Sequence, residues 1–262
     1  MDNKARVICV TNQKGGVGKS TTAEALAEGL TIRGYKTLLV DLDAQGSVTL
    51  TAGADPNRPT AYEVMTRAVT AQDATQEHAH EIMPRSDILP ASNALARIDV
   101  ELTATGKEYR LREQIAPLLS RYAFIVMDTP PSLGLLTVNA LTAADSVIIP
   151  AQADVYSLQG IGQLNDTFAA VRAYTNPSLT LGGILLTRHT PRSVISRDMA
   201  DAAQETAERM GTFLYNAVIR EAVAVKEAQA NQQPIYSYAP KSNAAADYMA
   251  FTEEFLERSG KI

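Results

Sequence analysis

The sequence is poor in cysteine, tryptophan and long apolar runs. Its 262 residues include one cysteine, Cys9, and no tryptophan. One cysteine cannot form a disulfide within the chain, so a disulfide-stabilised scaffold is excluded and a cytoplasmic setting is expected. No apolar run approaches the ~20 residues that a membrane-spanning helix needs. The chain passes from Met1 almost directly into its first strand-like run, so we expect no signal peptide.

Positive charge is also scarce. The 24 lysines and arginines are outnumbered by 29 aspartates and glutamates, which gives a formal net charge of −5. Any contact with nucleic acid must therefore come from a local basic patch, because the overall field opposes it. Hydrophobic residues make up 45% of the chain and charged residues 20%, which suits one large α/β domain over residues 1–262.

Short apolar runs alternate with helical patterns along the chain. This alternation predicts a doubly wound, mostly parallel sheet with helices on both faces. The expected strands cover residues 7–11, 37–41, 87–89, 124–128, 146–150, 182–187 and 212–219. The expected helices cover residues 19–33, 61–67, 98–104, 107–120, 135–143, 158–174, 194–210, 223–231 and 243–258.

A glycine-rich loop follows the first strand. Residues 13–21 read QKGGVGKST and lead into a helical pattern, which is the strand–loop–helix order of a phosphate-binding loop. The glycines let backbone N–H groups turn toward phosphate oxygens, and the helix N-terminus adds partial positive charge. Lys19 is expected to reach the β- and γ-phosphates, and the Ser20 hydroxyl to bind Mg²⁺. The expected nucleotide contacts in the loop are Lys14, Gly15, Gly16, Val17, Gly18, Lys19, Ser20 and Thr21.

The loop departs from the plain phosphate-binding pattern at its start. The pattern G-x-x-x-x-G-K-[ST] has glycine where this chain has Gln13, and an additional lysine, Lys14, follows. Lys19 already serves the nucleotide of its own chain. Lys14 therefore points elsewhere unless a second phosphate partner lies near.

Two acidic motifs follow the loop in the order that a nucleotide hydrolase requires. Asp41 and Asp43 end the second strand, at the edge where open α/β sheets bind ligands. Asp41 could hydrogen-bond metal-bound water, and Asp43 could orient or deprotonate the attacking water. Asp128 ends an apolar strand and is expected to hold Mg²⁺ directly or through water. The alternative is that Asp41 and Asp43 are turn or helix-capping residues.

Residues 14–20, KGGVGKS, resemble the deviant Walker A motif of the ParA/MinD family of P-loop ATPases. The resemblance implies an ATPase with slow intrinsic turnover that uses ATP or ADP with Mg²⁺. It also implies a homodimer with ATP sandwiched between the subunits, in which Lys14 crosses the interface to the phosphates of the partner. Lys14, Lys19 and Asp43 are then the catalytic residues.

Other stretches resemble the same family. The family's second motif usually has proline where Ala44 stands, and residues 128–131, DTPP, match its third. Residues 150–160 are similar to the segment that leads into the dimer-interface helix, and residues 234–242 to the C-terminal segment. The metal site would then use Ser20, Asp41 and Asp128. The adenine base would lie near residues 219–221 and beside Thr187 and Arg188.

The chain begins close to its first strand, so we expect no N-terminal helix-turn-helix, as in the short chromosomal ParA proteins. The resemblance then implies DNA partitioning, non-specific binding of double-stranded DNA in the ATP state, a ParB-type centromere-binding partner and a nucleoid-associated location. Candidate cations for DNA are Arg192, Arg220 and Lys226, with Arg188, Arg197, Lys241 and Arg258 as further candidates. The family usually has arginine where this chain has Ala224 and a proline–arginine pair where it has Arg220 and Glu221.

Several relatives of other function share such a loop. A membrane-associated MinD-like regulator would need a basic amphipathic C-terminal helix, whereas the stripe of Met249, Phe251, Phe255 and Leu256 has an acidic opposite face and is better explained as core packing. A cluster-carrying protein would need more cysteines than Cys9. A small-molecule ligase, a tyrosine kinase and a ParA relative that positions a cargo other than DNA are the remaining alternatives.

Overall fold

The computed structural model describes residues 4–77, 86–152, 154–190 and 194–261 of the chain. Its centre is a seven-stranded sheet with the strand order β3-β4-β2-β5-β1-β6-β7. β3 pairs antiparallel with β4, and the other pairings among the described strands are parallel. The strands are β1 (Arg6–Val10), β2 (Thr37–Asp41), β3 (Gln76–Glu77), β4 (Ser86–Leu89), β5 (Phe124–Asp128), β6 (Ser146–Gln152) and β7 (Thr180–Thr187).

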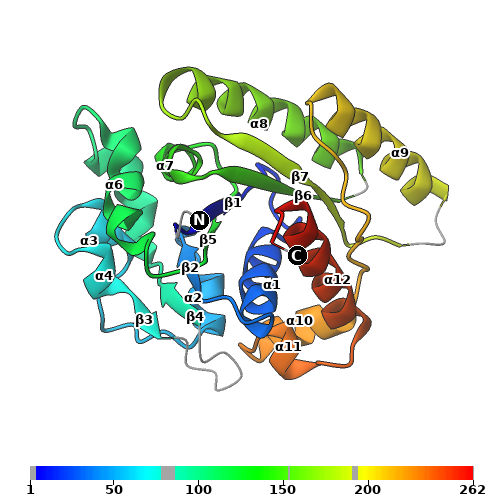
Figure 1. Ribbon diagram of the computed structural model, residues 1–262, viewed down its shortest axis with the longest axis horizontal. Coiled ribbons are helices and arrows are strands. Elements are labelled where there is room, and N and C mark those ends of the chain that lie inside the picture. Colours follow the sequence, from blue (N-terminus) through cyan, green and yellow to red (C-terminus); the bar gives the residue numbers. More distant parts are fainter. Residues whose placement is uncertain (1–3, 78–85, 153, 191–193, 262) are drawn as a thin grey trace.

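Helices cover both faces of this sheet, as the alternating sequence pattern predicts (Figure 1). α1 and α12 lie side by side on one face, and α7, α8 and α9 lie on the other. The helices of the first half are α1 (Lys19–Ile32), α2 (Ser47–Thr51), α3 (Ala61–Met65), α4 (Ala71–Ala74), α5 (Ile98–Glu101), α6 (Arg110–Ile115) and α7 (Leu135–Ala143). Those of the second half are α8 (Val155–Tyr174), α9 (Val194–Arg209), α10 (Val223–Ala230), α11 (Ile235–Tyr238) and α12 (Asn243–Arg258).

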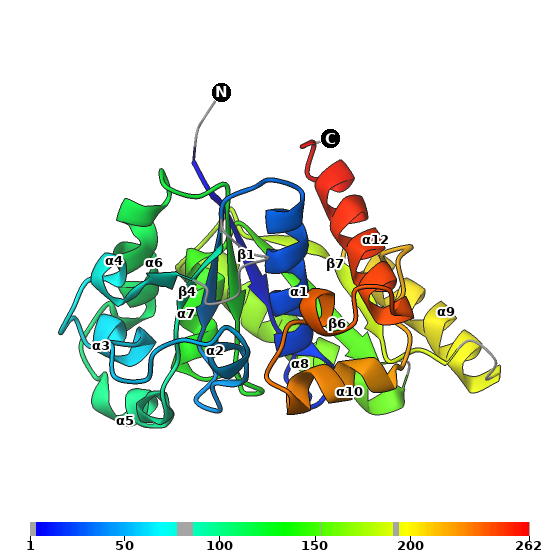
Figure 2. The ribbon, with the colours of Figure 1, turned by 90° about the horizontal axis from the view of Figure 1, so that it is seen from below.

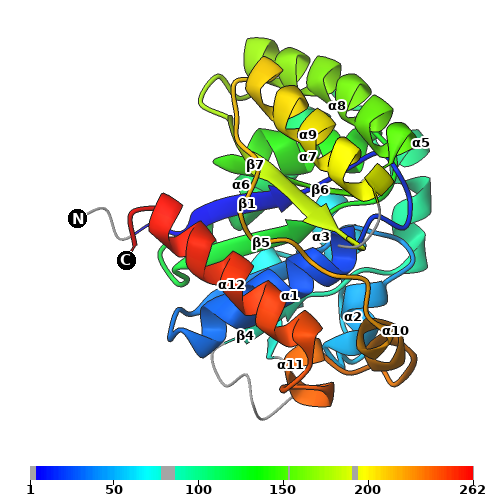
Figure 3. The same cartoon turned by 90° about the vertical axis from the view of Figure 1, so that its right-hand side faces the viewer.

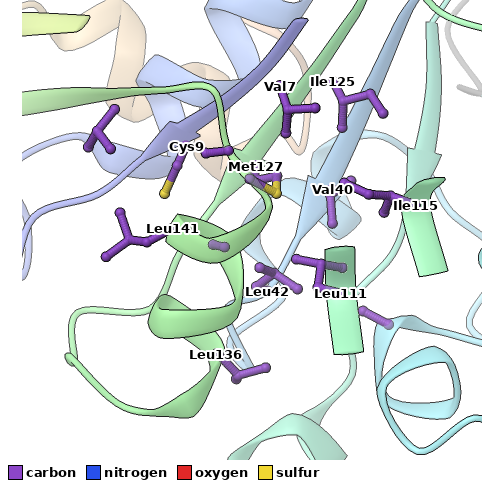
Figure 4. Close-up of a cluster of buried hydrophobic side chains, with 14 of the residues drawn as sticks. Val7, Cys9, Val40, Leu42, Leu111, Ile115, Ile125, Met127, Leu136 and Leu141 are labelled. Atoms are coloured by element: carbon purple, nitrogen blue, oxygen red, sulfur yellow. The ribbon is translucent and has the colours of Figure 1, made fainter. Parts of the chain in front are cut away.

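Alternate side chains of each central strand enter opposite cores. On β1, Val7 and Cys9 pack on the side of α6, α7 and α8, whereas Ile8 and Val10 pack on the side of α1 and α12. Figure 4 shows the first core, where β1, β2 and β5 meet α6 and α7. Because both faces of the sheet are covered by helices, its strands appear in the sequence as continuous apolar runs. The Cys9 thiol is buried, and this burial raises its pKa, so it behaves as a small apolar side chain.

The C-terminal helix α12 packs its apolar stripe into the second core. Phe251, Phe255 and Leu256 are buried, and Met249 is partly buried against them. The ring of Phe255 meets Phe124 of β5 edge-on, with 5.9 Å between centroids. Full burial of such side chains is worth roughly 1.5–3 kcal/mol each, so the stripe stabilises the fold, as the sequence predicted.

Three predicted elements are wrong in detail. Residues 212–219 do not form a regular strand, because the Glu254 carboxylate accepts the backbone N–H groups of Asn216 and Ala217 at 3.0 and 2.9 Å. The N–H groups of Asn216 and Ala217 therefore cannot join a strand ladder, and the segment forms one isolated bridge with β7, between Leu214 and Ile184.

The helix predicted over residues 107–120 is broken into 3₁₀ turns at Lys107–Tyr109 and Ala116–Leu118, with α6 between them. Pro117 lies in the second turn and has no N–H to continue an α-helix. The helix predicted over residues 98–104 shortens to α5, which a 3₁₀ turn at Asn93–Arg97 precedes. The short elements α2, α4, α11 and β3 were not predicted.

The parallel strands bring their carboxyl ends to one edge of the sheet. β5 lies between β1 and β2, and Asp128 is in register with both Val10 and Asp41. Figure 2 and Figure 3 show α2 and α10 near this edge, close to the start of α1. The glycine loop and both acidic motifs therefore converge at one place.

Candidate nucleotide site

The loop between β1 and α1 is built on two left-handed glycines. Gly16 and Gly18 have φ of +76° and +84°, a conformation that residues with a side chain rarely adopt. A Cβ at Gly15 or Gly16 would meet nothing within 4 Å, so open space lies beside this backbone. Asn12 anchors the loop, since it donates to the carbonyl of Pro150 at 2.8 Å and accepts from the N–H of Lys14 at 3.1 Å.

Lys19 lies at the first residue of α1, and its side chain turns back into the loop. It is 6% exposed, and its ammonium donates to the carbonyl of Lys14 at 3.0 Å. Burial lowers the pKa of Lys19, while the nearby Asp128 and Asp43 oppose this shift. A buried cation held over open space by one backbone carbonyl fits an anionic ligand.

Lys14 is held differently. Its ammonium donates to both carboxylate oxygens of Asp154 at 2.7 and 2.6 Å, and Asp154 follows the end of β6. The lysine side chain is 27% exposed and that of Asp154 35%. The two lysines of the loop therefore serve different partners.

Asp128 presents a buried carboxylate that no described residue meets with a hydrogen bond of good geometry. The residue is 0% exposed, and neither carboxylate oxygen has a partner of good geometry. Burial and the charge of Asp41 raise its pKa well above the usual value, and the neighbouring Ser20 hydroxyl partly offsets this. A buried anionic oxygen beside a hydroxyl fits Mg²⁺, which prefers such oxygen ligands.

Asp41 is also buried, but its oxygens are occupied. One accepts from the N–H of Asp43 at 3.0 Å, and the other accepts from the N–H and hydroxyl of Thr49 at 2.9 and 2.7 Å. Burial raises its pKa to about 6, and these hydrogen bonds limit the shift. Asp41 thus holds the first turn of α2, as in the helix-capping alternative. Sequence reasoning missed Thr49 as its partner.

Asp43 is half-buried and lies beyond the end of β2. Its carboxylate accepts from the N–H of Gln45 at 3.0 Å, which makes a local turn, and the side chain lines the same cavity as Lys19. The structure therefore brings Asp43, Lys19 and Ser20 to one cavity.

This cavity has a volume of about 360 Å³, enough for a nucleotide-sized ligand. Its phosphate-side lining is Gly15, Gly16, Gly18, Lys19, Ser20, Thr21, Asp43, Ser47 and Pro131. Its other lining is Thr187, Arg188, Ile219, Arg220, Glu221, Ala222, Val225, Lys226, Gln229 and Tyr248. Lys14 and Val17 are not among the lining residues.

The end of β7 joins the loop to the far side of this cavity. The Thr187 hydroxyl donates to the carbonyl of Val17 at 2.7 Å, so Thr187 supports the loop. Arg188 has a positive φ of 52°, donates to the carbonyl of Gly16 at 3.3 Å and forms an ion pair with Glu221 at 2.6 Å. Arg188 and Glu221 belong to the two segments where the sequence predicted the adenine base, and this ion pair joins those segments.

Two of the cations predicted to contact DNA lie at the rim of this cavity and are paired with acids. Arg220 binds Asp247 at 2.6 Å, and Lys226 binds Glu221 at 2.9 Å. The Arg188 and Lys226 contacts lower the pKa of Glu221 to about 2, so this acid is charged. Arg192 lies outside the described residues. Sequence reasoning missed Asp247 and Asp154, because acids far along the chain gave no local signal.

Sequence comparisons identify the family. A family model described as an AAA domain matches residues 5–181. The chromosome partitioning protein ParA of Caulobacter vibrioides is 36% identical over 261 residues, which cover 98% of this chain and 96% of that protein. The chain is a member of the ParA family. The sporulation initiation inhibitor protein Soj of Bacillus subtilis is 35% identical over 252 residues, 95% of this chain and 97% of that protein.

Solved structures agree on the fold. A cobyrinic acid a,c-diamide synthase from Mycobacterium smegmatis, solved with bound ADP and magnesium, has 33% identity and a TM-score of 0.83, covering 98% of this chain and 96% of that chain. A putative plasmid partition protein from Borrelia burgdorferi has a TM-score of 0.80 at 24% identity, covering 97% of this chain and 99% of that chain. The second likeness concerns the fold alone. Among the described residues of this ParA-family chain, no helix is both long and apolar enough to cross a membrane.

Proposed function

We propose that this ParA-family chain is a Mg²⁺-dependent ATPase whose bound ATP closes a homodimer, and that the dimer acts in DNA partitioning. The observation that carries the dimer is the placement of the two loop lysines. Lys19 lines the nucleotide cavity, whereas Lys14 does not and is held by Asp154. Lys14 is therefore available to the phosphates of a second subunit once Asp154 releases it.

The chemistry follows from the groups at the cavity. The loop amides and Lys19 would hold the phosphates, with Ser20 and Asp128 as ligands of Mg²⁺, which supplies positive charge to the phosphate oxygens. Asp43 reaches the cavity from a half-exposed turn and would orient the attacking water. Asp41 acts through Thr49, since it holds α2 and thereby the segment that carries Asp43.

The DNA and partner functions rest on the relatives. Two of them are described as chromosome partitioning protein ParA, from Caulobacter vibrioides and Myxococcus xanthus. By analogy, the ATP-bound dimer would bind duplex DNA without sequence preference, and a ParB-type partner would stimulate hydrolysis. Such binding depends on cations that neutralise phosphates.

Two observations favour a second candidate, a ParA/MinD-like spatial regulator that positions a non-DNA cargo or a membrane-associated complex without binding DNA. Arg220 and Lys226 are each paired with an acid, and the chain carries a net charge of −5. Both features weaken a field that would attract DNA. The ATPase and the dimer are the same in the two candidates, so the DNA assay separates them.

The test measures binding of fluorescent 24-base-pair duplexes of unrelated sequence by anisotropy, with ATP, with ADP and without nucleotide. We expect binding only with ATP, of equal affinity for each sequence, and steeply weaker as the salt concentration rises. Lys226→Ala should weaken binding, whereas Arg121→Ala, an exposed cation just before β5 and far from the cavity, should not. Binding that is absent at low salt would favour the second candidate, and ATP-dependent amidation of a small molecule would indicate a ligase.

A further inference from the structure

A second cavity lies beside the nucleotide site, between α1, α2 and α10. Its volume is about 250 Å³. Most of its lining residues are polar, and four of them, Ser20, Thr21, Ser47 and Gln229, also line the nucleotide cavity. Those that matter here are Glu24, Ser47, Thr51, Gln229 and Gln232. Each of these side chains offers an oxygen atom, the type of ligand that hard cations prefer.

Glu24 is the one carboxylate among the described residues of this wall, and no lysine or arginine of the described chain forms an ion pair with it. The residue is 8% exposed, and its Oε1 has no hydrogen-bond partner. Burial raises its pKa to about 8, with the charges of Asp128 and Asp41 adding to the shift and a hydrogen bond with Thr51 opposing it. Without a cation, burial therefore keeps this carboxyl group protonated at neutral pH, and a bound cation would favour its charged form.

A second buried acid, Glu28, lies close to Glu24, and its charged form would add to the uncompensated negative charge. Glu28, one turn further along α1, is 0% exposed and neither of its carboxylate oxygens has a partner. Within the part of the chain that the structure describes, Lys19 is the one lysine or arginine that is buried. Its ammonium turns toward the phosphate loop rather than toward this cavity.

We propose that this second cavity binds a monovalent cation, K⁺ in the cell, through the Glu24 carboxylate and the neutral oxygens of Ser47, Thr51, Gln229 and Gln232. One carboxylate balances one positive charge. A divalent ion in a protein cage usually takes several carboxylates. The described residues hold no group of three or more histidine, cysteine, aspartate or glutamate side chains that could hold such an ion.

The site would join three elements that flank the nucleotide. Glu24 belongs to the helix that follows the phosphate loop, Thr51 to the helix that follows Asp43, and Gln229 to α10. Gln229 already donates to the Thr21 hydroxyl at 3.0 Å. A bound cation would therefore stabilise this arrangement in the free protein, whether or not the proposed partition function is correct.

The experiment compares melting temperatures of the nucleotide-free protein in KCl, NaCl and choline chloride at equal ionic strength. The wild type should melt roughly 2–4 °C higher in KCl than in choline chloride. Glu24→Gln should abolish that difference, whereas Glu257→Gln, an exposed glutamate of α12, should keep it. Equal melting temperatures of the wild type in the three salts would overturn the proposal, and so would a K⁺ effect that persists in Glu24→Gln.

A direct measurement covers the case in which Glu24→Gln does not fold. Crystals of the wild-type protein soaked in thallium acetate, a K⁺ substitute, should show an anomalous density peak within the second cavity. No peak there, in crystals whose cavity is open to solvent, would contradict the site. Because the melting and the soaking need no ATP and no DNA, failure of the partition function would leave both results unchanged.

Discussion

The ion pair between Lys14 and Asp154 should restrain dimerisation, and Asp154→Asn tests this. Both side chains are about one-third exposed or less, so solvent screens the pair and its contribution is about 1 kcal/mol at most. A dimer in which each Lys14 crosses to its partner must break two such pairs. Removing them should therefore favour the ATP-bound dimer by up to about 2 kcal/mol, or roughly 30-fold in its dissociation constant.

The assay is sedimentation equilibrium with ATP and Mg²⁺ in an Asp43→Ala background, where slow hydrolysis preserves the dimer. Asp166→Asn is the matched control, because Asp166 is an exposed carboxylate of α8, the helix that begins directly after Asp154, and forms no ion pair with the described residues. The control should dimerise as its parent does. A dissociation constant that is unchanged or larger in Asp154→Asn would refute the reasoning.

Three further changes have definite outcomes. Lys19→Ala should abolish ATP binding in calorimetry, since the cavity loses its one buried cation, and normal affinity would be a contradiction. Asp43→Ala should bind ATP and accumulate as a dimer with hydrolysis lost, whereas a monomer in light scattering would count against its role. Gly29→Ala should destabilise the fold by about 1–3 kcal/mol in urea, because the new Cβ would clash with the Thr252 hydroxyl and lie 3.0 Å from Thr252 Cγ2, where α1 meets α12. Gly162→Ala, a helical position with open space, should cause no loss.

The sheet and the site could be predicted because their signals are local. A continuous apolar run predicts a doubly covered strand, and β1, β2 and β5 were placed almost to the residue for that reason. The glycine loop and Asp128 follow those strands directly. Parallel topology then requires that they meet at one edge of the sheet.

The remaining features depend on partners far apart in the sequence. Nothing near Lys14 indicates that Asp154 will hold it, and nothing near Asn216 indicates that Glu254 will take its N–H and end a strand. The same holds for the cations at the rim of the cavity. The sequence around Arg220 does not indicate an acidic partner, and only the packing of α12 brings Asp247 beside it. Tertiary contacts of this kind override local preference.

Mixing two inactive variants tests directly whether Lys14 completes the nucleotide site of a second subunit. Lys14→Ala keeps a complete binding loop but cannot donate its lysine, and Lys19→Ala keeps Lys14 but cannot hold ATP. In a heterodimer, the Lys14→Ala subunit would bind ATP and receive Lys14 from its partner. If Lys14 acts across the interface, the mixture should hydrolyse ATP in proportion to the heterodimer present, although each variant alone is inactive. A mixture as inactive as its components would contradict it.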